Sequence, residues 1–299
     1  MSMLRHEKPW LRVLISHGFT EHRGWWAETA AALHAQGITV GWMDHYHHGL
    51  STGRPNDLPG IHILTQSLRA AVLAMESTGQ GGRTRGSAGE GADAGQAPPL
   101  VLLGHSQGAL AVLHTLHRHP ELAPAGLVLA SPLLGLGRKT VVYGRVLSAL
   151  LRFAPRLRVR TQTNPRRLTT DSTLWPRYLA DPLRKTGVTR RYFHAMIAGI
   201  AKARAEMTHL SAPLLLLEAG DERVVSSRAI GQWFEAAVAP EKSRRQYPGM
   251  RHELFNDVGR EQVLADVLAW ARAHFGGGST GSGNPPGGNP AAGSTGRVA

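Results

Sequence analysis

The sequence predicts an α/β protein, in which a mostly parallel sheet is covered by helices on both faces and carries an inserted helical cap. Three observations predict this fold class. Short apolar runs alternate with helical patterns up to residue 135 and again after residue 210. The segment 136–210 breaks this alternation and carries the excess positive charge. Two stretches, 77–98 and 276–299, hold almost no bulky apolar residue, so they cannot offset the chain entropy that folding costs.

The predicted strands are apolar runs that are too short to be told from buried helix by themselves. They are Leu11–Ser16, Ile38–Met43, Leu100–Leu103, Gly126–Ala130 and Leu214–Glu218. The helical patterns between them decide the interpretation, because strand–helix alternation is typical of a parallel sheet covered on both faces. These patterns are Trp25–Gln36, Leu58–Ser77, Gln107–Arg118, Ser227–Ala239 and Gly259–Phe275.

The segment 136–210 is mostly helical in pattern and is broken by several prolines, which favours a cap inserted between two core strands. It holds 16 Lys and Arg against three Asp and Glu, and so accounts alone for the formal charge of +13. That excess fits an anionic partner and fits equally a solvated Arg-rich surface. Within it, Val141–Phe153 is apolar around much of its circumference. Such a helix is buried, lines an apolar pocket or contacts lipid, and burial is the commonest of the three.

These patterns predict three parts. The core comprises residues 1–135 and 211–275, with a flexible surface loop at 77–98. The cap comprises 136–210, and 276–299 is a disordered tail. The absence of cysteine excludes disulfides, thiol catalysis and zinc–thiolate sites. The chain start lacks the pattern of a signal peptide, and no run approaches the ~18 apolar residues of a membrane span, so we expect a cytoplasmic protein.

The strongest chemical signal is Gly104-His105-Ser106-Gln107-Gly108, which fits G-x-S-x-G. It directly follows an apolar strand and directly precedes a helical pattern. A sharp strand-to-helix turn of this kind exposes a serine hydroxyl as a nucleophile, and flanking glycines allow the backbone to approach closely. The sequence therefore predicts Ser106 as the nucleophile of a hydrolase.

A serine hydroxyl needs a base, which in this chain order is a histidine late in the sequence. His252 lies between a possible short strand, Arg244–Tyr247, and the final helical pattern, and is the predicted base. The acid that orients it should follow the strand at Leu214–Glu218, where Asp221 and Glu222 are adjacent candidates.

Two backbone N–H groups should stabilise the oxyanion. One is expected from Gln107, which follows the nucleophile, and the other from Phe19, in the loop after the first predicted strand. The histidines at 45, 47 and 48 would suggest a metal, but Asp44 is their one neighbouring carboxylate. We therefore expect no metal and no cofactor.

Together these residues resemble the monoacylglycerol lipase and lysophospholipase group of α/β-hydrolases, a serine aminopeptidase-like family. The family pattern H-G-x-x-E-H-x-G appears as HGFTEHRG at 17–24, and the nucleophile motif appears at 104–108. The late histidine block appears as HEL at 252–254. The likeness covers roughly residues 11–275 and includes the cap sequence LTTDSTLWPRYLADPL.

The resemblance implies an α/β-hydrolase fold, favours Glu222 over Asp221 as the acid, and implies substrate-binding positions at His17, Gly18 and His105. The chain departs from the family in three places. The pattern D-x-R-G-H-G-x-S-x-G, at 44–53, lacks its Arg and one Gly. Trp25 is bulkier than usual. Only ten residues precede the first predicted strand, so the N-terminal hairpin of the family is expected to be missing.

The predicted function is hydrolysis of carboxylic esters of single-chain lipids, of the monoacylglycerol lipase or lysophospholipase type, through an acyl-enzyme. The apolar cap would hold the acyl chain, and its Arg-rich face could bring the protein to an anionic membrane as a peripheral contact. Two alternatives stay open. One is a carboxylesterase, thioesterase or acyltransferase acting on another substrate. The other is a catalytically silent basic binding protein, although no recognition motif supports nucleic acid as its partner.

Overall fold

The computed structural model describes residues 1–79, 97–150, 152–153, 157–159 and 164–276. Its centre is a seven-stranded sheet in the order β1-β3-β2-β4-β5-β8-β9. The strands are β1 (Ser2–Leu4), β2 (Leu11–Ser16), β3 (Ile38–Trp42), β4 (Leu100–His105), β5 (Gly126–Ala130), β8 (Leu214–Ala219) and β9 (Lys242–Tyr247). Neighbours pair in parallel except β1, which runs antiparallel to β3. The predicted α/β class, a mostly parallel sheet with helices, is confirmed.

Central strands are buried on both faces, as parallel strands between two helical layers must be. Every residue of β2, β4, β5 and β8 is buried. The edge strand β9 is largely exposed and carries charge along the sequence KSRRQY, which discourages pairing with another chain.

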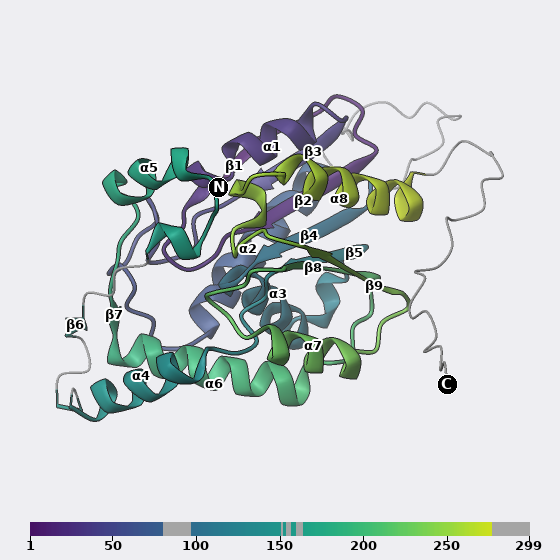
Figure 1. Cartoon of the computed structure of the whole chain (residues 1–299). Helices are drawn as coiled ribbons and strands as arrows, with labels where there is room; N and C mark the ends of the chain where they lie inside the picture. Colours follow the sequence, from purple (N-terminus) through teal and green to yellow (C-terminus); the bar gives the residue numbers. More distant parts are fainter. Residues whose placement is uncertain (80–96, 151, 154–156, 160–163, 277–299) are drawn as a thin grey trace, which may run out of the picture.

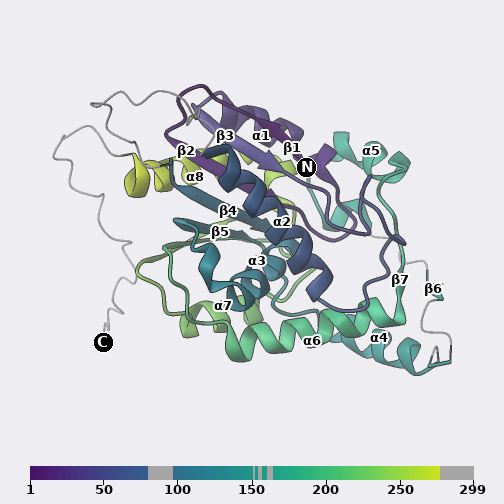
Figure 2. The same cartoon turned by 180° about the vertical axis from the view of Figure 1, so that it is seen from behind.

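Helices cover both faces of the sheet (Figure 1). On one face lie α1 (Ala27–His34) and α8 (Arg260–Phe275). On the other lie α2 (His62–Gly79), α3 (Gln107–Arg118) and α7 (Ser227–Ala236), and Figure 2 shows α2 and α3 from that side. Alternate strand residues enter different layers: Leu102 packs in the cluster under α2, α3 and α7, whereas Val101 and Leu103 pack in the cluster under α1 and α8.

The segment after β5 contains α4 (Arg138–Leu150), α5 (Trp175–Ala180) and α6 (Arg190–Glu206), with a small antiparallel pair, β6 (Arg158–Val159) and β7 (Val188–Thr189). The helix α6 packs on α3 of the core, and α4 packs on α6 rather than on the sheet. Among the described elements α4 packs chiefly on α6, and much of its apolar surface stays exposed. Burial, the commonest of the three possibilities for Val141–Phe153, is therefore wrong for most of its large apolar side chains. The exposed ones are Val142, Tyr143, Val146, Leu150 and Phe153.

The structure adds one strand before the first predicted strand, but among the described residues this strand pairs with β3 and forms no N-terminal hairpin with β2. A strand, β1, precedes Leu11, where none was predicted, and its residues pair with Val40–Trp42 of β3. A three-residue strand is too short to show a pattern and is set by its partner. The helix α2 starts at His62 and ends at Gly79, so it enters the predicted loop at 77–98. Residues 80–96 of the predicted loop, and the predicted tail from residue 277 onward, lie outside the described residues. In the described part of the chain, no helix combines the length and apolar character needed to span a bilayer.

Candidate active site

Ser106 lies at the sharp turn between β4 and α3, with φ +51° and ψ −113°. A non-glycine residue rarely adopts this conformation, and neighbouring packing must hold it there. The turn is pressed against the loop after β2, so a Cβ on Gly108 would lie 2.0 Å from the carbonyl oxygen of Ser16. Glycine at 108 is therefore a steric requirement, and the G-x-S-x-G context identified in the sequence is built as a strand–turn–helix.

The structure brings three side chains from distant parts of the chain into one relay. The Ser106 hydroxyl lies 2.9 Å from Nε2 of His252 and can donate its proton there. On the other side of the ring, His252 Nδ1 lies 2.9 Å from Oε2 of Glu222. Both Ser106 and His252 are buried. This geometry suits proton transfer from an alcohol to an imidazole held by a carboxylate.

Glu222, and not Asp221, faces His252. The Glu222 carboxylate also accepts hydrogen bonds from the backbone amides of Val224 at 2.7 Å and Val225 at 3.2 Å. Burial disfavours its charge, but His252 and these two amides outweigh burial and lower the pKa of Glu222. Asp221 instead pairs with Arg223 at 2.7 Å and with Arg251 at 3.2 Å.

The loop after β2 lies directly against Ser106. A Cβ on Gly18 would lie 3.2 Å from Cβ of Ser106, so the loop that carries Phe19 passes close to Ser106. The side chain of Glu21 fixes this loop by accepting from the backbone N–H of Gly18 and from Nε1 of Trp26, both at 2.9 Å.

A buried ion pair supports the same region from behind. His105 Nδ1 lies 3.0 Å from Oε1 of Glu21, and His105 Nε2 donates to the backbone carbonyl of His252 at 3.1 Å. Burial opposes the charge on His105, but Glu21 outweighs it and raises the pKa of His105 to about 9. The pair thus connects the loop after β2, the turn at Ser106 and the loop that carries His252.

His17 is buried beside this loop and is engaged with the protein. Its Nδ1 donates to the Gly18 carbonyl at 2.8 Å, and its Nε2 accepts from the backbone N–H of His45 at 3.1 Å. Burial lowers the pKa of His17, which keeps the ring neutral. The side chains of His17 and His105, predicted to bind substrate, are therefore placed as supports of the loops around Ser106. Across the described ranges, no group of three or more His, Asp or Glu side chains is arranged to hold a metal ion.

Sequence reasoning assigned no role to two residues that the structure places at the site. Glu21 stands inside the HGFTEHRG pattern, which was a signal that could have drawn attention to it. Tyr192, on α6, bonds to the side chain of Gln107, and no local pattern marks it.

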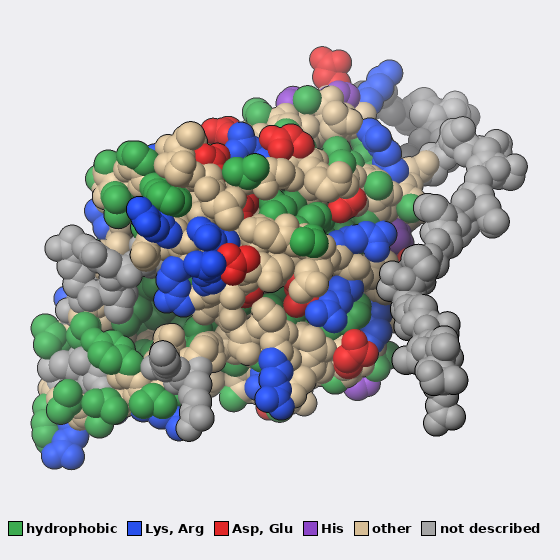
Figure 3. All heavy atoms as spheres, viewed as in Figure 1, with side chains coloured by type: hydrophobic (Ala, Val, Ile, Leu, Met, Phe, Trp, Pro, Cys, Tyr) green, Lys and Arg blue, Asp and Glu red, His purple; other side chains and the backbone are tan. Residues whose placement is uncertain are grey.

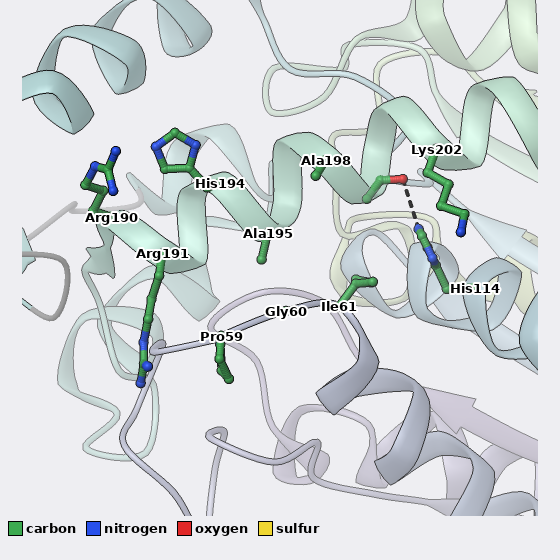
Figure 4. Close-up of a pocket in the computed structure, with 11 residues that line it drawn as sticks. Pro59, Gly60, Ile61, His114, Arg190, Arg191, His194, Ala195, Ala198 and Lys202 are labelled. Atoms are coloured by element: carbon green, nitrogen blue, oxygen red, sulfur yellow. Dashed lines mark hydrogen bonds between the residues drawn. The ribbon is translucent and has the colours of Figure 1, made fainter. Parts of the chain in front are cut away.

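A hollow of about 480 Å³ lies elsewhere, between α6 and the segment that leads into α2 (Figure 4). Pro59 and Ile61 face Ala195 and Ala198 across it. Because neither the relay nor the two predicted oxyanion residues line this hollow, it is separate from the candidate active site.

The chain is similar in sequence and in structure to several known proteins. The profile of the family described as serine aminopeptidase, S33, matches residues 7–259. The chain is 26% identical over 268 residues to the monoacylglycerol lipase of Mycolicibacterium smegmatis, covering 88% of each chain. It is 25% identical to the human monoglyceride lipase, covering 92% of this chain and 86% of the relative. A crystal structure of Paleococcus ferrophilus monoacylglycerol lipase superposes with a TM-score of 0.75 at 22% identity, covering 91% of this chain and 98% of that one, in agreement with an α/β-hydrolase fold.

Proposed function

We propose, from the premise that this chain belongs to the serine aminopeptidase S33 family, that it hydrolyses carboxylic esters of single-chain lipids through an acyl-enzyme. The observation that carries the proposal is the relay of Ser106, His252 and Glu222, joined by two contacts of 2.9 Å. Nucleophile, base and orienting acid are the three parts that ester hydrolysis by a serine requires.

In the first half of the reaction, the Ser106 hydroxyl attacks the ester carbonyl while its proton moves to His252 Nε2. Glu222 holds the Nδ1–H and stabilises the imidazolium that forms. The carbonyl oxygen becomes an oxyanion, which accepts from the amides of Phe19 and Gln107. Among the described residues, neither of these amides donates to a protein acceptor, so both are available. The intermediate then collapses, the C–O bond breaks, and His252 gives its proton to the departing alcohol.

In the second half, water replaces the alcohol. His252 takes a proton from the water, the resulting hydroxide attacks the acyl carbon, and the same amides hold the oxyanion. Collapse releases the fatty acid, and the proton on His252 returns to Ser106. The enzyme is unchanged and one ester bond has been hydrolysed.

The substrate class rests on the relatives and on the cap. Two relatives that cover most of the chain are named monoacylglycerol lipase and monoglyceride lipase. The apolar side chains exposed on α4 and just after it also suit a protein that takes its substrate from a lipid surface. Comparing ester hydrolysis across acyl-chain lengths would test this class, because a preference for short acyl chains would point to a general carboxylesterase.

The same surface is the proposed contact with an anionic membrane. Val142, Tyr143, Val146, Leu150 and Phe153 are more than half exposed, and Figure 3 shows apolar side chains gathered where α4 lies. The arginines at 145 and 152 are exposed on the same segment. A basic apolar helix of this kind binds the boundary between headgroups and acyl chains.

Leu150→Asp should weaken binding to phosphatidylglycerol vesicles by about tenfold or more, given the transfer energy of a leucine side chain. The matched control is Leu179→Asp on α5, where an equally exposed leucine lies outside the α4 surface. Equal loss in both variants would contradict a specific role of α4.

The core proposal is tested by Ser106→Ala. Turnover of p-nitrophenyl butyrate should disappear, and fluorophosphonate labelling should be lost, while Ser77→Ala, at an exposed serine on α2, should behave as the native enzyme. Full turnover by Ser106→Ala would remove the serine mechanism. A native protein that neither turns over esters nor takes the label would favour the binding-protein alternative.

A further inference from the structure

One side chain of the cap contacts both residues to which we assign the oxyanion amides. Tyr192, in the first turn of α6, is 3% exposed, and its hydroxyl donates a hydrogen bond to Oε1 of Gln107. Its ring centroid lies 5.1 Å from that of Phe19. Burial raises the pKa of the Tyr192 phenol, so its hydroxyl is protonated and can donate at neutral pH.

The Gln107 side chain depends on this contact. Gln107 is fully buried, and its Nε2 has no hydrogen-bond partner within the described structure. The Tyr192 hydroxyl therefore satisfies Oε1 of this buried amide, and without it both polar atoms of the Gln107 side chain would lack a partner among the described residues. Since Gln107 directly follows Ser106 and begins α3, a displaced Gln107 side chain would disturb the turn that carries the nucleophile.

Tyr192 is held in place by an ion pair between the cap and the core. Asp57 is buried on the segment that leads into α2, and it pairs with the guanidinium of Arg191. Asp57 also accepts from the Thr189 hydroxyl at 3.0 Å, and Thr189 in turn caps α6 by accepting from the backbone N–H of Tyr192 at 3.1 Å. Figure 4 shows Arg191 reaching from α6 toward the segment that contains Pro59.

These contacts form one continuous connection from the core, through the first turn of the cap helix, to the oxyanion residues. We propose that Tyr192 is a positioning residue of the oxyanion hole and that the Asp57–Arg191 ion pair seats it there. The proposal rests on the proposed hydrolase function and deepens it. It implies that the cap must be positioned correctly on the core for full kcat, and not only for substrate binding.

Tyr192→Phe removes the hydroxyl and keeps the ring. We expect kcat on p-nitrophenyl butyrate to fall about tenfold, which corresponds to about 1.4 kcal/mol of transition-state stabilisation, with KM changed less than twofold. Fluorophosphonate labelling should slow by a similar factor, because the phosphoryl oxygen occupies the same hole.

Tyr247→Phe is the matched control for stability. Tyr247 is also buried, and Tyr247→Phe removes one hydrogen bond, which the hydroxyl donates to Asp266 at 2.9 Å. Both variants should lower the melting temperature, but only Tyr192→Phe should lower kcat. Equal kcat in the two variants would overturn the proposal, while turnover by the native enzyme would leave the hydrolase function standing.

A double-variant comparison tests the route through Gln107. Gln107→Met removes the acceptor and keeps the backbone amide and much of the volume. If Tyr192 acts through Gln107, the double variant should be no slower than the slower single variant. Multiplied losses would contradict this route. If Tyr192→Phe folds poorly, Gln107→Met alone should show the same fall in kcat, and a native kcat in Gln107→Met would overturn the route.

The ion pair has its own test. Asp57→Asn should lower kcat in the native background and leave kcat unchanged in the Tyr192→Phe background, although it should lower the melting temperature in both. A loss of kcat that is as large in the Tyr192→Phe background would show that Asp57 acts by another route.

Discussion

Replacing Glu222 by Gln tests the orienting acid, because Gln keeps the shape and removes the charge. The amides of Val224 and Val225 require an acceptor and should hold the Gln carbonyl oxygen. The Gln NH₂ group would then face His252 Nδ1, where the carboxylate stands at 2.9 Å. A donor at that place favours the tautomer with its proton on Nε2, which cannot accept the proton of Ser106.

The expected loss is large for catalysis. A wrong tautomer in a serine–histidine–acid site lowers kcat by about 10⁴, or roughly 5.4 kcal/mol at 1.36 kcal/mol per decade. The effect on folding has a defined sign. Because the folded-state pKa of Glu222 is lowered, its charge stabilises the fold above the ordinary pKa of a glutamate, and this stability is lost as the pH falls through the folded value. At neutral pH, Glu222→Gln should therefore also lower the melting temperature.

The assay is kcat on p-nitrophenyl butyrate, with Asp221→Asn as the matched control. Asp221 is adjacent in sequence, is partly exposed and pairs with Arg223 and Arg251. Exposed pairs of this kind contribute little, so kcat of Asp221→Asn should stay within about twofold of the native value. A Glu222→Gln enzyme within tenfold of native kcat, or a larger loss in Asp221→Asn, would refute the reasoning.

Three further outcomes follow from the buried supports of the site. The His105–Glu21 pair should make stability fall at high pH: the pKa of His105 is raised to about 9, so its contribution is complete below the ordinary histidine value and is lost as the pH rises through about 9. Thermal melts at increasing pH should show this loss in the native chain and less of it in Glu21→Gln. Gly108→Ala should abolish fluorophosphonate labelling, since its Cβ would lie 2.0 Å from a backbone oxygen. Gly231→Ala is the control in α7, where the nearest contact of the new Cβ would be at 3.8 Å, and it should raise the free energy of unfolding in urea by about 0.5–1 kcal/mol. Asp257→Ala should lower that free energy by about 3 kcal/mol, because the buried Asp257 carboxylate accepts from three backbone amides and two threonine hydroxyls, and these hydrogen bonds would be unmade. An unchanged urea midpoint would contradict this.

Much of the sheet could be predicted from local sequence, because a strand buried on both faces must be apolar along its whole length. The bounds of β2 and β5 match the predicted Leu11–Ser16 and Gly126–Ala130. The sharp turn at Ser106 was predictable for a similar reason, since the close approach at Gly108 leaves its requirement for glycine in the sequence. The predicted base, His252, could be placed by its position late in the chain, and the structure brings it to Ser106.

Other features depend on contacts between residues far apart in the chain, and local pattern carries no record of them. Asp221 and Glu222 are neighbours of the same chemical type, and which one faces His252 depends on Arg251 holding Asp221 and on two amides holding Glu222. The apolar pattern of α4 is the same whether the helix is buried or exposed, and only its packing on α6 decides between them. Thus the sequence by itself determined the class of fold and the chemical groups available, because burial and backbone geometry restrict which residues can stand there. The tertiary structure decided which of those groups meet, because hydrogen bonds and ion pairs act only at contact distance.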